Sequence, residues 1–391
     1  MRTGLILVAL FLALVVACGG GDAATKPKAA AETGPSGGTE QKAPLPQAQA
    51  KEPERTPPAG TTTPAPPISS AGTGQSERPT LRIEAPVLRI AVPRMGVLNA
   101  AVQMAQKGGM FESNSLSVTL VDVADSQAAV QALLGGQVQF AVVTLQDAAK
   151  ASEGANPLRA VAGVLGSQPY NVALADAVVQ RLGLVETSRL AERLAALKGL
   201  RLAVPQEPLA EATARALVSA AGLAPADVKL VPTDSAQLLE VLKAGQVDGV
   251  VAAHPILERA IVEQGAKLVV NLSRGEVTEL EPFPWLVLAT TQRFAAAAPD
   301  TTVAVVLAIW NAERQIRRDP TRSQDLLAGD YASLGADVFR ESARIYLPAV
   351  PNIPLLTPSS YSKVFRVLGE TPAPFLQVVD NRYIEVLIPR Q

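Results

Sequence analysis

Cysteine and histidine, from which many catalytic and metal sites are built, are nearly absent from this sequence. The chain has one cysteine and one histidine among its 391 residues. It therefore has no cysteine pair for an intrachain disulfide, no thiolate metal cluster and no histidine-rich zinc site. The HExxH motif, the phosphate-binding loop and the dinucleotide-binding fingerprint are also missing. We expect a protein that is not an enzyme and that has neither a metal nor a cofactor.

An excess of one charge sign is also lacking. The chain has 35 Lys and Arg against 36 Asp and Glu, and only 4% of its residues are aromatic. A nucleic-acid interface needs a basic surface, often with aromatic side chains between the charges, so we expect no nucleic-acid partner. Beyond residue 17 the sequence contains no apolar run of the roughly 20 residues that a membrane-spanning helix needs. The main body is therefore expected to be soluble.

One long apolar run is present at the N-terminus. Residues 5–17 are uninterrupted apolar and follow Arg2, a length typical of a signal-peptide core and too short to span a membrane. The run ends in the sequence VVAC, which resembles a bacterial lipobox. The resemblance implies that residues 1–18 are a lipoprotein signal peptide and that Cys18 is lipidated. It also implies a location in the cell envelope, on the periplasmic or extracellular side, with the lipid as the only membrane contact.

The next segment differs sharply in composition from the remainder. Residues 19–86 are rich in Pro, Ala, Gly and Thr and contain few side chains that could be buried. Such a segment cannot offset its ordering entropy, so we expect a disordered tether. Residues 87–391 are apolar enough for a large core, which is the size of one two-lobed domain or of two small ones.

An internal duplication organises this body. The sequence LRIAVP at 88–93 reappears as LRLAVP at 200–205. The first of these regions continues with ADS and then GQV at 136–138. The second continues with TDS and then GQV at 245–247. Both pairs occur in the same order at nearly the same offset. The body therefore contains two copies of one unit.

Each copy has the pattern strand, helix, strand, helix, strand. The ranges expected are 88–92, 98–107, 116–123, 126–134 and 140–144 in the first copy, and 201–204, 209–221, 228–232, 235–244 and 247–252 in the second. Alternating strands and helices predict an α/β fold with a parallel sheet in each copy. Two crossings, 158–165 with 170–174 and 267–272 with 285–290, would form a hinge. We expect lobe 1 over about 87–170 plus 285–391, and lobe 2 over about 175–270, with the C-terminal tail on lobe 1.

Several motifs carry a family resemblance. Three stretches resemble the solute-binding proteins of nitrate-, sulfonate- and taurine-type ABC importers, including thiamine-pyrimidine-binding relatives. They are AQKGGMF followed by LSVTL within 105–120, ALLGGQVQFA at 132–141, and PAP with VDNRY in the tail. The resemblance implies a two-lobed type II periplasmic-binding-protein fold with a cleft. It also implies a small-molecule solute, permease and ATPase partners and a monomeric chain.

Ligands of such α/β lobes bind at the carboxyl ends of the strands. The residues expected to line the cleft are Arg94, Met95, Asp125, Ser126, Thr144, Gln206, Glu207, Asp234, Ser235 and His254, with Tyr170 and Trp285 on the crossings. Arg94 is either a carboxylate-binding group or a solvated loop residue, and His254 is either a ligand contact or a cap before a proline turn. Asp125 and Asp234 stand at helix N-cap positions.

Glu207 departs from the family pattern. The family often has a Gly/Ser-rich turn here, suited to an anionic head group, whereas a carboxylate at a helix N-terminus repels anions. We therefore expect a neutral or weakly charged organic ligand, such as a heterocycle or an amide. Two other functions remain open: a tethered sensor that binds the same ligand, and an enzyme that makes a thiamine pyrimidine precursor. The scarcity of cysteine and histidine disfavours the enzyme.

Overall fold

The computed structural model describes residues 81–185 and 187–389. Cys18, the expected signal peptide and residues 19–80 of the expected tether lie outside these residues. None of the helices that the structure describes is both long enough and apolar enough to cross a membrane.

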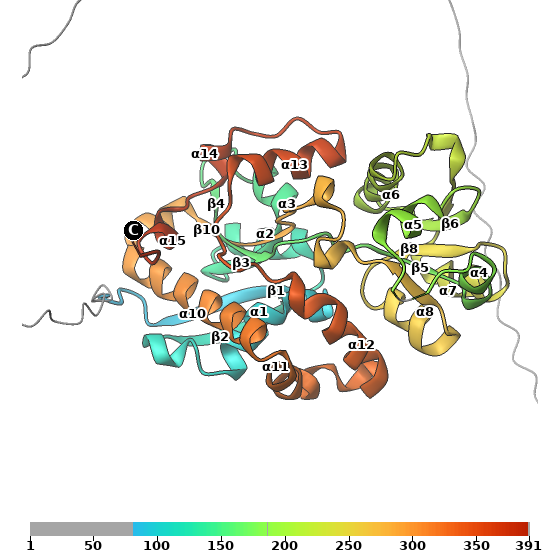
Figure 1. Ribbon diagram of the computed structural model, residues 1–391. Helices are drawn as coiled ribbons and strands as arrows, with labels where there is room; N and C mark the ends of the chain where they lie inside the picture. Colours follow the sequence, from blue (N-terminus) through green and yellow to red (C-terminus); the bar gives the residue numbers. More distant parts are fainter. Residues whose placement is uncertain (1–80, 186, 390–391) are drawn as a thin grey trace, which may run out of the picture. The chain divides into compact units, whose positions relative to one another are not determined.

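Two five-stranded sheets organise the body (Figure 1). The first sheet has the order β2-β1-β3-β10-β4 and the second has the order β7-β6-β8-β5-β9. The strands of the first sheet are β1 (Val87–Pro93), β2 (Ser117–Val123), β3 (Phe140–Thr144), β4 (Leu158–Leu165) and β10 (Leu286–Thr291). Those of the second are β5 (Asn171–Leu174), β6 (Arg201–Pro205), β7 (Lys229–Thr233), β8 (Gly249–Ala252) and β9 (Lys267–Val270).

Helices cover both sheets and form most of the C-terminal part. Those of the first copy are α1 (Ala100–Lys107), α2 (Ser126–Leu134) and α3 (Leu145–Lys150). Those around the second sheet are α4 (Asp176–Arg181), α5 (Leu190–Ala195), α6 (Pro208–Ala220), α7 (Leu238–Lys243) and α8 (Ile256–Gln264). The C-terminal helices are α9 (Gln292–Ala297), α10 (Pro299–Arg318), α11 (Pro320–Leu327), α12 (Ala336–Tyr346), α13 (Pro358–Leu368), α14 (Phe375–Val378) and α15 (Arg382–Glu385).

The sequence prediction of two parallel sheets is only partly right, because both sheets are mixed. β1 pairs in parallel with β2 and β3, and β6 pairs in parallel with β7 and β8, as expected. However, β10 is antiparallel to β3 and β4, and β5 is antiparallel to β8 and β9. The reason is the path of the chain. A strand that enters a sheet from a crossing starts at the edge where the parallel strands end, so it runs in the opposite direction.

The elements of the duplication match the sequence prediction closely. Helix α2 and strand β3 have the predicted bounds, and the segment predicted as one helix over 235–244 is a short 3-10 turn, η4 (Ser235–Gln237), followed by α7. The GQV motifs begin with equivalent glycines: Gly136 has φ +69° and Gly245 has φ +66°. Only glycine adopts this left-handed conformation without strain, and so both helices end in the same kind of turn.

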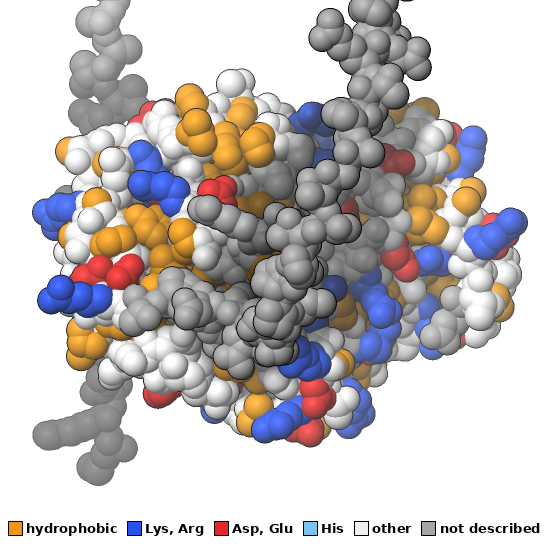
Figure 2. Space-filling view, turned by 60° about the vertical axis from the view of Figure 1, so that its left-hand side comes forward, with side chains coloured by type: hydrophobic (Ala, Val, Ile, Leu, Met, Phe, Trp, Pro, Cys, Tyr) orange, Lys and Arg blue, Asp and Glu red, His pale blue; other side chains and the backbone are white. Residues whose placement is uncertain are grey.

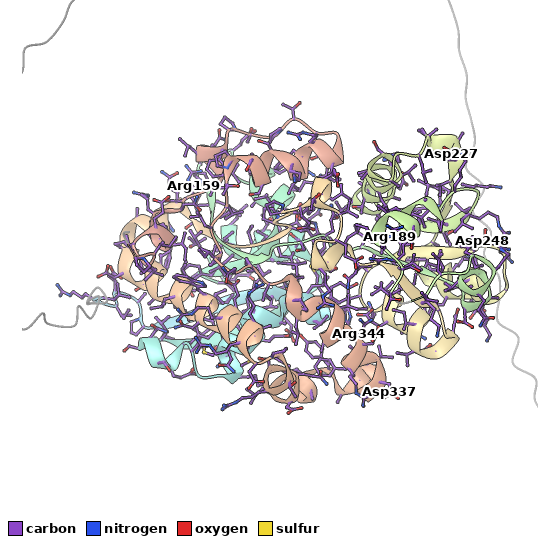
Figure 3. The ribbon with its side chains drawn as sticks, in the orientation of Figure 1. Arg159, Arg189, Asp227, Asp248, Asp337 and Arg344 are labelled. Atoms are coloured by element: carbon purple, nitrogen blue, oxygen red, sulfur yellow. The ribbon has the colours of Figure 1, made fainter. Side chains whose placement is uncertain are left out.

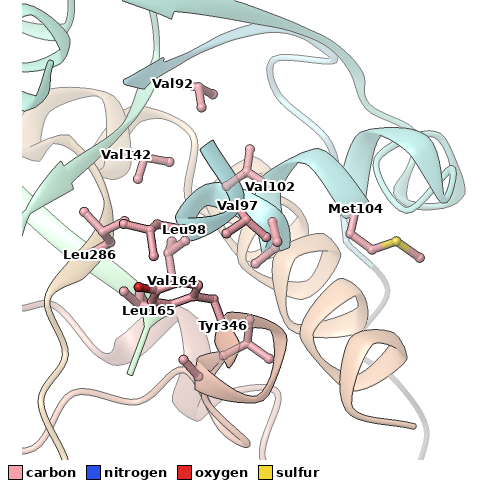
Figure 4. Close-up of a cluster of buried hydrophobic side chains, with 14 of the residues drawn as sticks. Val92, Val97, Leu98, Val102, Met104, Val142, Val164, Leu165, Leu286 and Tyr346 are labelled. Atoms are coloured by element: carbon pink, nitrogen blue, oxygen red, sulfur yellow. The ribbon is translucent and has the colours of Figure 1, made fainter. Parts of the chain in front are cut away.

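The core joins the crossings to both lobes. Val92 of β1 belongs to the same buried cluster as Leu165 at the end of β4 and Leu286 at the start of β10 (Figure 4). Tyr346 at the end of α12 belongs to the same cluster and is almost completely buried. Strands buried on both faces need continuous apolar sequence, and β3 and β10 are buried at every residue.

Segments at both ends of the described chain pack onto the first sheet's side of the molecule. The Glu84 carboxylate accepts a hydrogen bond from the Thr301 backbone N–H at 2.8 Å, which fastens residues before β1 to the first turn of α10. The expectation of a disordered tether as far as residue 86 is therefore wrong for Arg82, Glu84 and Ala85, which hydrogen-bond to Asp300 and Thr301. Near the C-terminus, the backbone N–H of Asp380 donates to Ala160 O at 2.9 Å and the Tyr383 hydroxyl donates to Ala295 O at 3.0 Å. These two contacts join the C-terminal tail to β4 and to α9.

Candidate functional site

The carboxyl ends of the first sheet's parallel strands form one side of the candidate site. The backbone N–H of Arg94, just after β1, donates to Val123 O at the end of β2 at 3.1 Å. The hydroxyl oxygen of Ser126, at the start of α2, accepts from the Thr144 N–H at the end of β3 at 2.8 Å. The structure thus brings the ends of three strands together at this edge.

The side chains at this edge differ in what they already bind. Asp125 caps α2, because its carboxylate accepts from the Ala128 N–H at 2.8 Å. The Thr144 hydroxyl donates to the Asp147 carboxylate at 2.8 Å and accepts from the Asp147 N–H, so it caps α3. Arg94 is exposed and Met95 is half-buried. Among the described residues at this edge, the side chains of Arg94 and Met95 therefore cap no helix.

The second sheet contributes an equivalent edge. The Gln206 backbone N–H donates to Thr233 O at 3.2 Å, which joins the ends of β6 and β7. The Asp234 carboxylate accepts from the Ala236 N–H at 2.8 Å and caps the η4 turn. The capping roles that the sequence predicted for Asp125 and Asp234 are confirmed.

Glu207 lies between two hydroxyl groups at this second edge. The Tyr170 hydroxyl donates to Glu207 Oε2 at 2.5 Å, and the Ser235 hydroxyl donates to Glu207 Oε1 at 2.8 Å. Glu207 precedes α6 at the N-cap position, yet its side chain makes no hydrogen bond to that helix. Burial, with the nearby Glu207 carboxylate as the second cause, raises the pKa of Tyr170. Tyr170 is therefore a hydrogen-bond donor at neutral pH.

His254 is packed into the contact between the two lobes. Its Nδ1 is 2.8 Å from Glu258 Oε1 and 3.2 Å from the Ser342 hydroxyl of α12. The side chains of His254 and Glu258 are only 4% and 0% exposed, respectively. Glu258 Oε2 has no hydrogen-bond partner among the described residues. In this arrangement the imidazole binds protein groups.

Gly96 is the residue of the first lobe that meets His254. Its φ is +56°, and a Cβ at this position would lie 2.2 Å from His254 Nε2. The Tyr331 hydroxyl donates to Gly96 O at 3.1 Å and holds the turn in place. A real Cβ does not approach a heavy atom so closely. The two carboxyl edges can therefore meet here only because residue 96 is a glycine.

Trp285 lies apart from the Glu207 group. Its backbone N–H donates to Leu165 O at 3.0 Å, and its carbonyl accepts from the Leu145 N–H at 2.8 Å. The half-buried indole packs against the hydrophobic core. The structure therefore places Trp285 on the second crossing, as expected, with its side chain on the core.

Sequence reasoning did not identify Glu258, Ser342 or Tyr346 as neighbours of the site. One signal was available, because Glu258 follows His254 at the i, i+4 spacing that brings two side chains together on a helix face. The contacts of His254 with Gly96 and with α12 join distant parts of the chain, and no local pattern predicts them. Among the described residues, no group of three or more His, Cys, Asp or Glu side chains could bind a metal ion.

Comparisons with solved structures identify the fold. The structure of a putative sulfonate ABC transporter's periplasmic sulfonate-binding protein from Methylobacillus flagellatus has a TM-score of 0.56 at 15% identity, covering 78% of this chain and 94% of that one. The aliphatic sulphonate binding protein SsuA from Escherichia coli has a TM-score of 0.52 at 16% identity, covering 73% and 86%. The prediction of a two-lobed type II periplasmic-binding-protein fold is confirmed.

Sequence comparisons agree with this fold. The nitrate import ATP-binding protein NrtC of Synechococcus elongatus is 29% identical over 232 residues, which are 54% of this chain and 33% of that protein. The chain thus spans about a third of the length of this curated relative. The family model described as NMT1/THI5 like matches residues 99–323, which is more than half of the chain. The chain belongs to the NMT1/THI5-like family, so the resemblance seen in the sequence is confirmed.

Proposed function

We propose that this chain is the solute-binding component of an ABC importer, which captures a small organic molecule and delivers it to permease and ATPase subunits. The observation that carries the proposal is the meeting of the two carboxyl edges at Gly96 and His254. In α/β lobes these edges are where ligands bind, and two lobes joined by two crossings can close on a solute. The family and the fold support the same role.

The proposed ligand is neutral or weakly charged. Glu207 is an exposed carboxylate at the second edge, next to the start of α6, where it would repel an anion. Each of its oxygens accepts one hydroxyl hydrogen bond and keeps a further lone pair. A ligand with N–H groups, such as an amide or a nitrogen heterocycle, fits this acceptor.

The first edge offers the complementary group. Arg94 is exposed beside Met95, and a guanidinium donates to carbonyl or ring-nitrogen acceptors. An acceptor on the ligand facing Arg94 and a donor facing Glu207 would orient the molecule between the lobes. Such paired recognition binds a ligand without changing it, and so we propose a binding protein that carries out no reaction on its solute.

We also propose an extracytoplasmic location with a lipid anchor. The signal peptide 1–18 would direct export, and the lipidated Cys18 with the tether that begins at residue 19 would attach the two-lobed body, residues 87–391, to the membrane surface. Lobe 1 would comprise about 87–170 plus 285–391, and lobe 2 about 175–270. The support for the anchor is the sequence VVAC after an apolar core of signal-peptide length.

A thermal-shift screen over small solutes tests the function. A ligand stabilises the folded state by RT ln(1 + [L]/Kd), which is about 2.7 kcal/mol at a hundredfold excess over Kd. We expect an amide or a heterocycle to raise the melting temperature, and nitrate, sulfate and taurine to leave it unchanged. A shift with one of those anions that is lost in Arg94→Ala would contradict the ligand class. No shift with any solute would contradict the function.

A further inference from the structure

A cavity lies between the two crossings. It has a volume of about 620 Å³ and is bounded by the two crossings and the segment that joins α12 to α13. We call this space the hinge cavity. Its lining includes Gly166 and Ser167, six residues of the segment 273–284, and residues 348–357. None of the residues predicted to bind the solute lines it.

The wall of the hinge cavity is firmly built. The segment between α12 and α13 hydrogen-bonds to the free edge of β4, because Gly163 N–H donates to Pro354 O at 2.8 Å and Gly166 N–H donates to Ala349 O at 2.9 Å. A Cβ on Gly166 would meet Pro351 Cβ at 3.4 Å, so the two backbones are in close contact. Prolines have few conformations to lose, and they give this wall a rigid apolar surface.

The charges around the hinge cavity are positive on balance. Arg274 and Arg317 both line it, and Glu281 is the one acid among its lining residues. Burial raises the pKa of Glu281 to about 7, so this carboxyl group carries only part of a negative charge at neutral pH. The Lys363 ammonium adds a further positive charge nearby, since it donates to the backbone oxygen of Thr278 at 3.4 Å.

We propose that the hinge cavity is a second ligand site, which binds an organic carboxylate with a flat apolar body. The carboxylate would bind the guanidinium groups of Arg274 and Arg317, and the apolar body would lie against the proline-rich wall. Guanidinium–carboxylate hydrogen bonds are among the strongest in proteins, and cavities of this size commonly hold small organic ligands.

The position of the cavity gives its ligand an effect on the hinge. Both crossings contribute to the lining, and the wall segment connects α12, which packs against α8, with α13, which packs against α6. A molecule bound there would contact both crossings, which must move when the lobes open. The carboxylate is therefore expected to change the affinity for the solute as well as to bind by itself.

The test uses the full chain and 2-naphthoate as the probe, with naphthalene-2-carboxamide as its uncharged counterpart. Isothermal titration should show that 2-naphthoate binds and that the carboxamide binds about tenfold more weakly, because the amide lacks the charge. Arg274→Gln and Arg317→Gln should each weaken 2-naphthoate about tenfold, whereas Arg317→Lys should retain most of the affinity.

Arg318→Gln is the matched control, because Arg318 is an exposed neighbour on the same helix that does not line the cavity. It should leave the affinity for 2-naphthoate unchanged. Failure of 2-naphthoate to bind, equal binding of the carboxamide, or equal losses in Arg317→Gln and Arg318→Gln would each overturn the proposal. These outcomes leave the solute-binding function untouched, since none of the variants alters a residue that is predicted to bind the solute.

Discussion

The two copies of the duplicated unit are alike at the amino ends of their strands and different at the carboxyl ends. At the amino end of β1, Gln139 Oε1 accepts from the Arg89 backbone N–H at 2.9 Å. At the amino end of β6, Asp248 Oδ2 accepts from the Arg201 backbone N–H at 2.8 Å in the same way. Figure 3 shows Asp248 on the side of the second lobe that faces away from the first.

At the carboxyl ends the equivalent positions have diverged. The turn after β1 contains Gly96, which accommodates His254, whereas the turn after β6 contains Glu207, which accepts two hydroxyl groups. The two copies therefore share the side-chain contact at the amino end of the first strand, and they differ where the lobes face each other. On the face shown in Figure 2, hydrophobic patches lie among side chains of both charge signs, without a field of one sign.

The largest effect is expected where the two carboxyl edges touch. Gly96→Ala should lower the free energy of unfolding by about 2–4 kcal/mol, because the new Cβ would clash with His254 and the left-handed backbone would be strained. Gly136→Ala is the matched control: its φ is +69°, but nothing lies within 4 Å of the added Cβ. Its cost should be about 1 kcal/mol, from backbone strain alone.

Urea unfolding of both variants measures this difference. In a His254→Ala background, Gly96→Ala should cost no more than the control, because the clash is gone. Equal losses for Gly96→Ala and Gly136→Ala in the wild-type background would show that the two lobes do not meet here in solution.

A smaller effect is expected at the amino ends. The hydrogen bond from the Arg201 side chain lowers the pKa of Asp248 below its usual value of 3.8. The interaction therefore stabilises the protein above that pKa, and this contribution is lost as the pH falls further into the acid range. Asp248→Asn should cost about 1–2 kcal/mol at pH 7.

Urea unfolding of Asp248→Asn at pH 7 and at pH 3 checks the sign. The difference from the wild type should shrink at the lower pH, where Asp248 begins to be protonated. A loss of the same size at both pH values would mean that the charge of Asp248 contributes nothing to stability. Asp248 would then act only as a hydrogen-bond acceptor, as the uncharged Gln139 does at the other amino end.

The hinge should respond to pH in the opposite direction. Burial raises the pKa of Glu281 to about 7 from 4.5, so the folded state favours the protonated carboxyl and loses stability as the pH rises between these values. Glu281→Gln resembles the protonated form. It should raise the free energy of unfolding by about 2 kcal/mol at pH 8 and leave it nearly unchanged at pH 4. A variant less stable than the wild type at pH 8 would refute this account of Glu281.

The smallest effect on stability is expected at the proposed anchor. Cys18→Ala should leave the melting temperature of the body unchanged, because the body's core is built from residues far along the chain. It should move the exported protein from the membrane fraction to the soluble fraction, since the lipid would be its only attachment. Retention of the variant in the membrane fraction would rule out the lipid as the sole anchor.

Sequence patterns predicted the elements of both copies because each element repeats a local periodicity and the copies support one another. The mixed pairing of β5 and β10 could not be predicted in this way, since it depends on the direction in which the chain returns from a crossing. Asp125 was recognisable as a cap from its position before a helix, whereas the surroundings of His254 depend on Ser342 and Gly96, which are distant in sequence. Local capping is encoded locally, and contacts between lobes are not.

The most direct test of the central claim is to locate the bound solute by NMR. The strongest stabilising compound from the solute screen would be titrated into labelled protein while backbone amide shifts are followed. We predict shifts at both carboxyl edges, including the amides of Met95, Ser126 and Ser235, with smaller changes at Arg89 and Arg201 at the amino ends. Shifts at only one lobe's carboxyl edge, or shifts confined to the amino ends, would contradict the proposal that the two edges bind the solute between them.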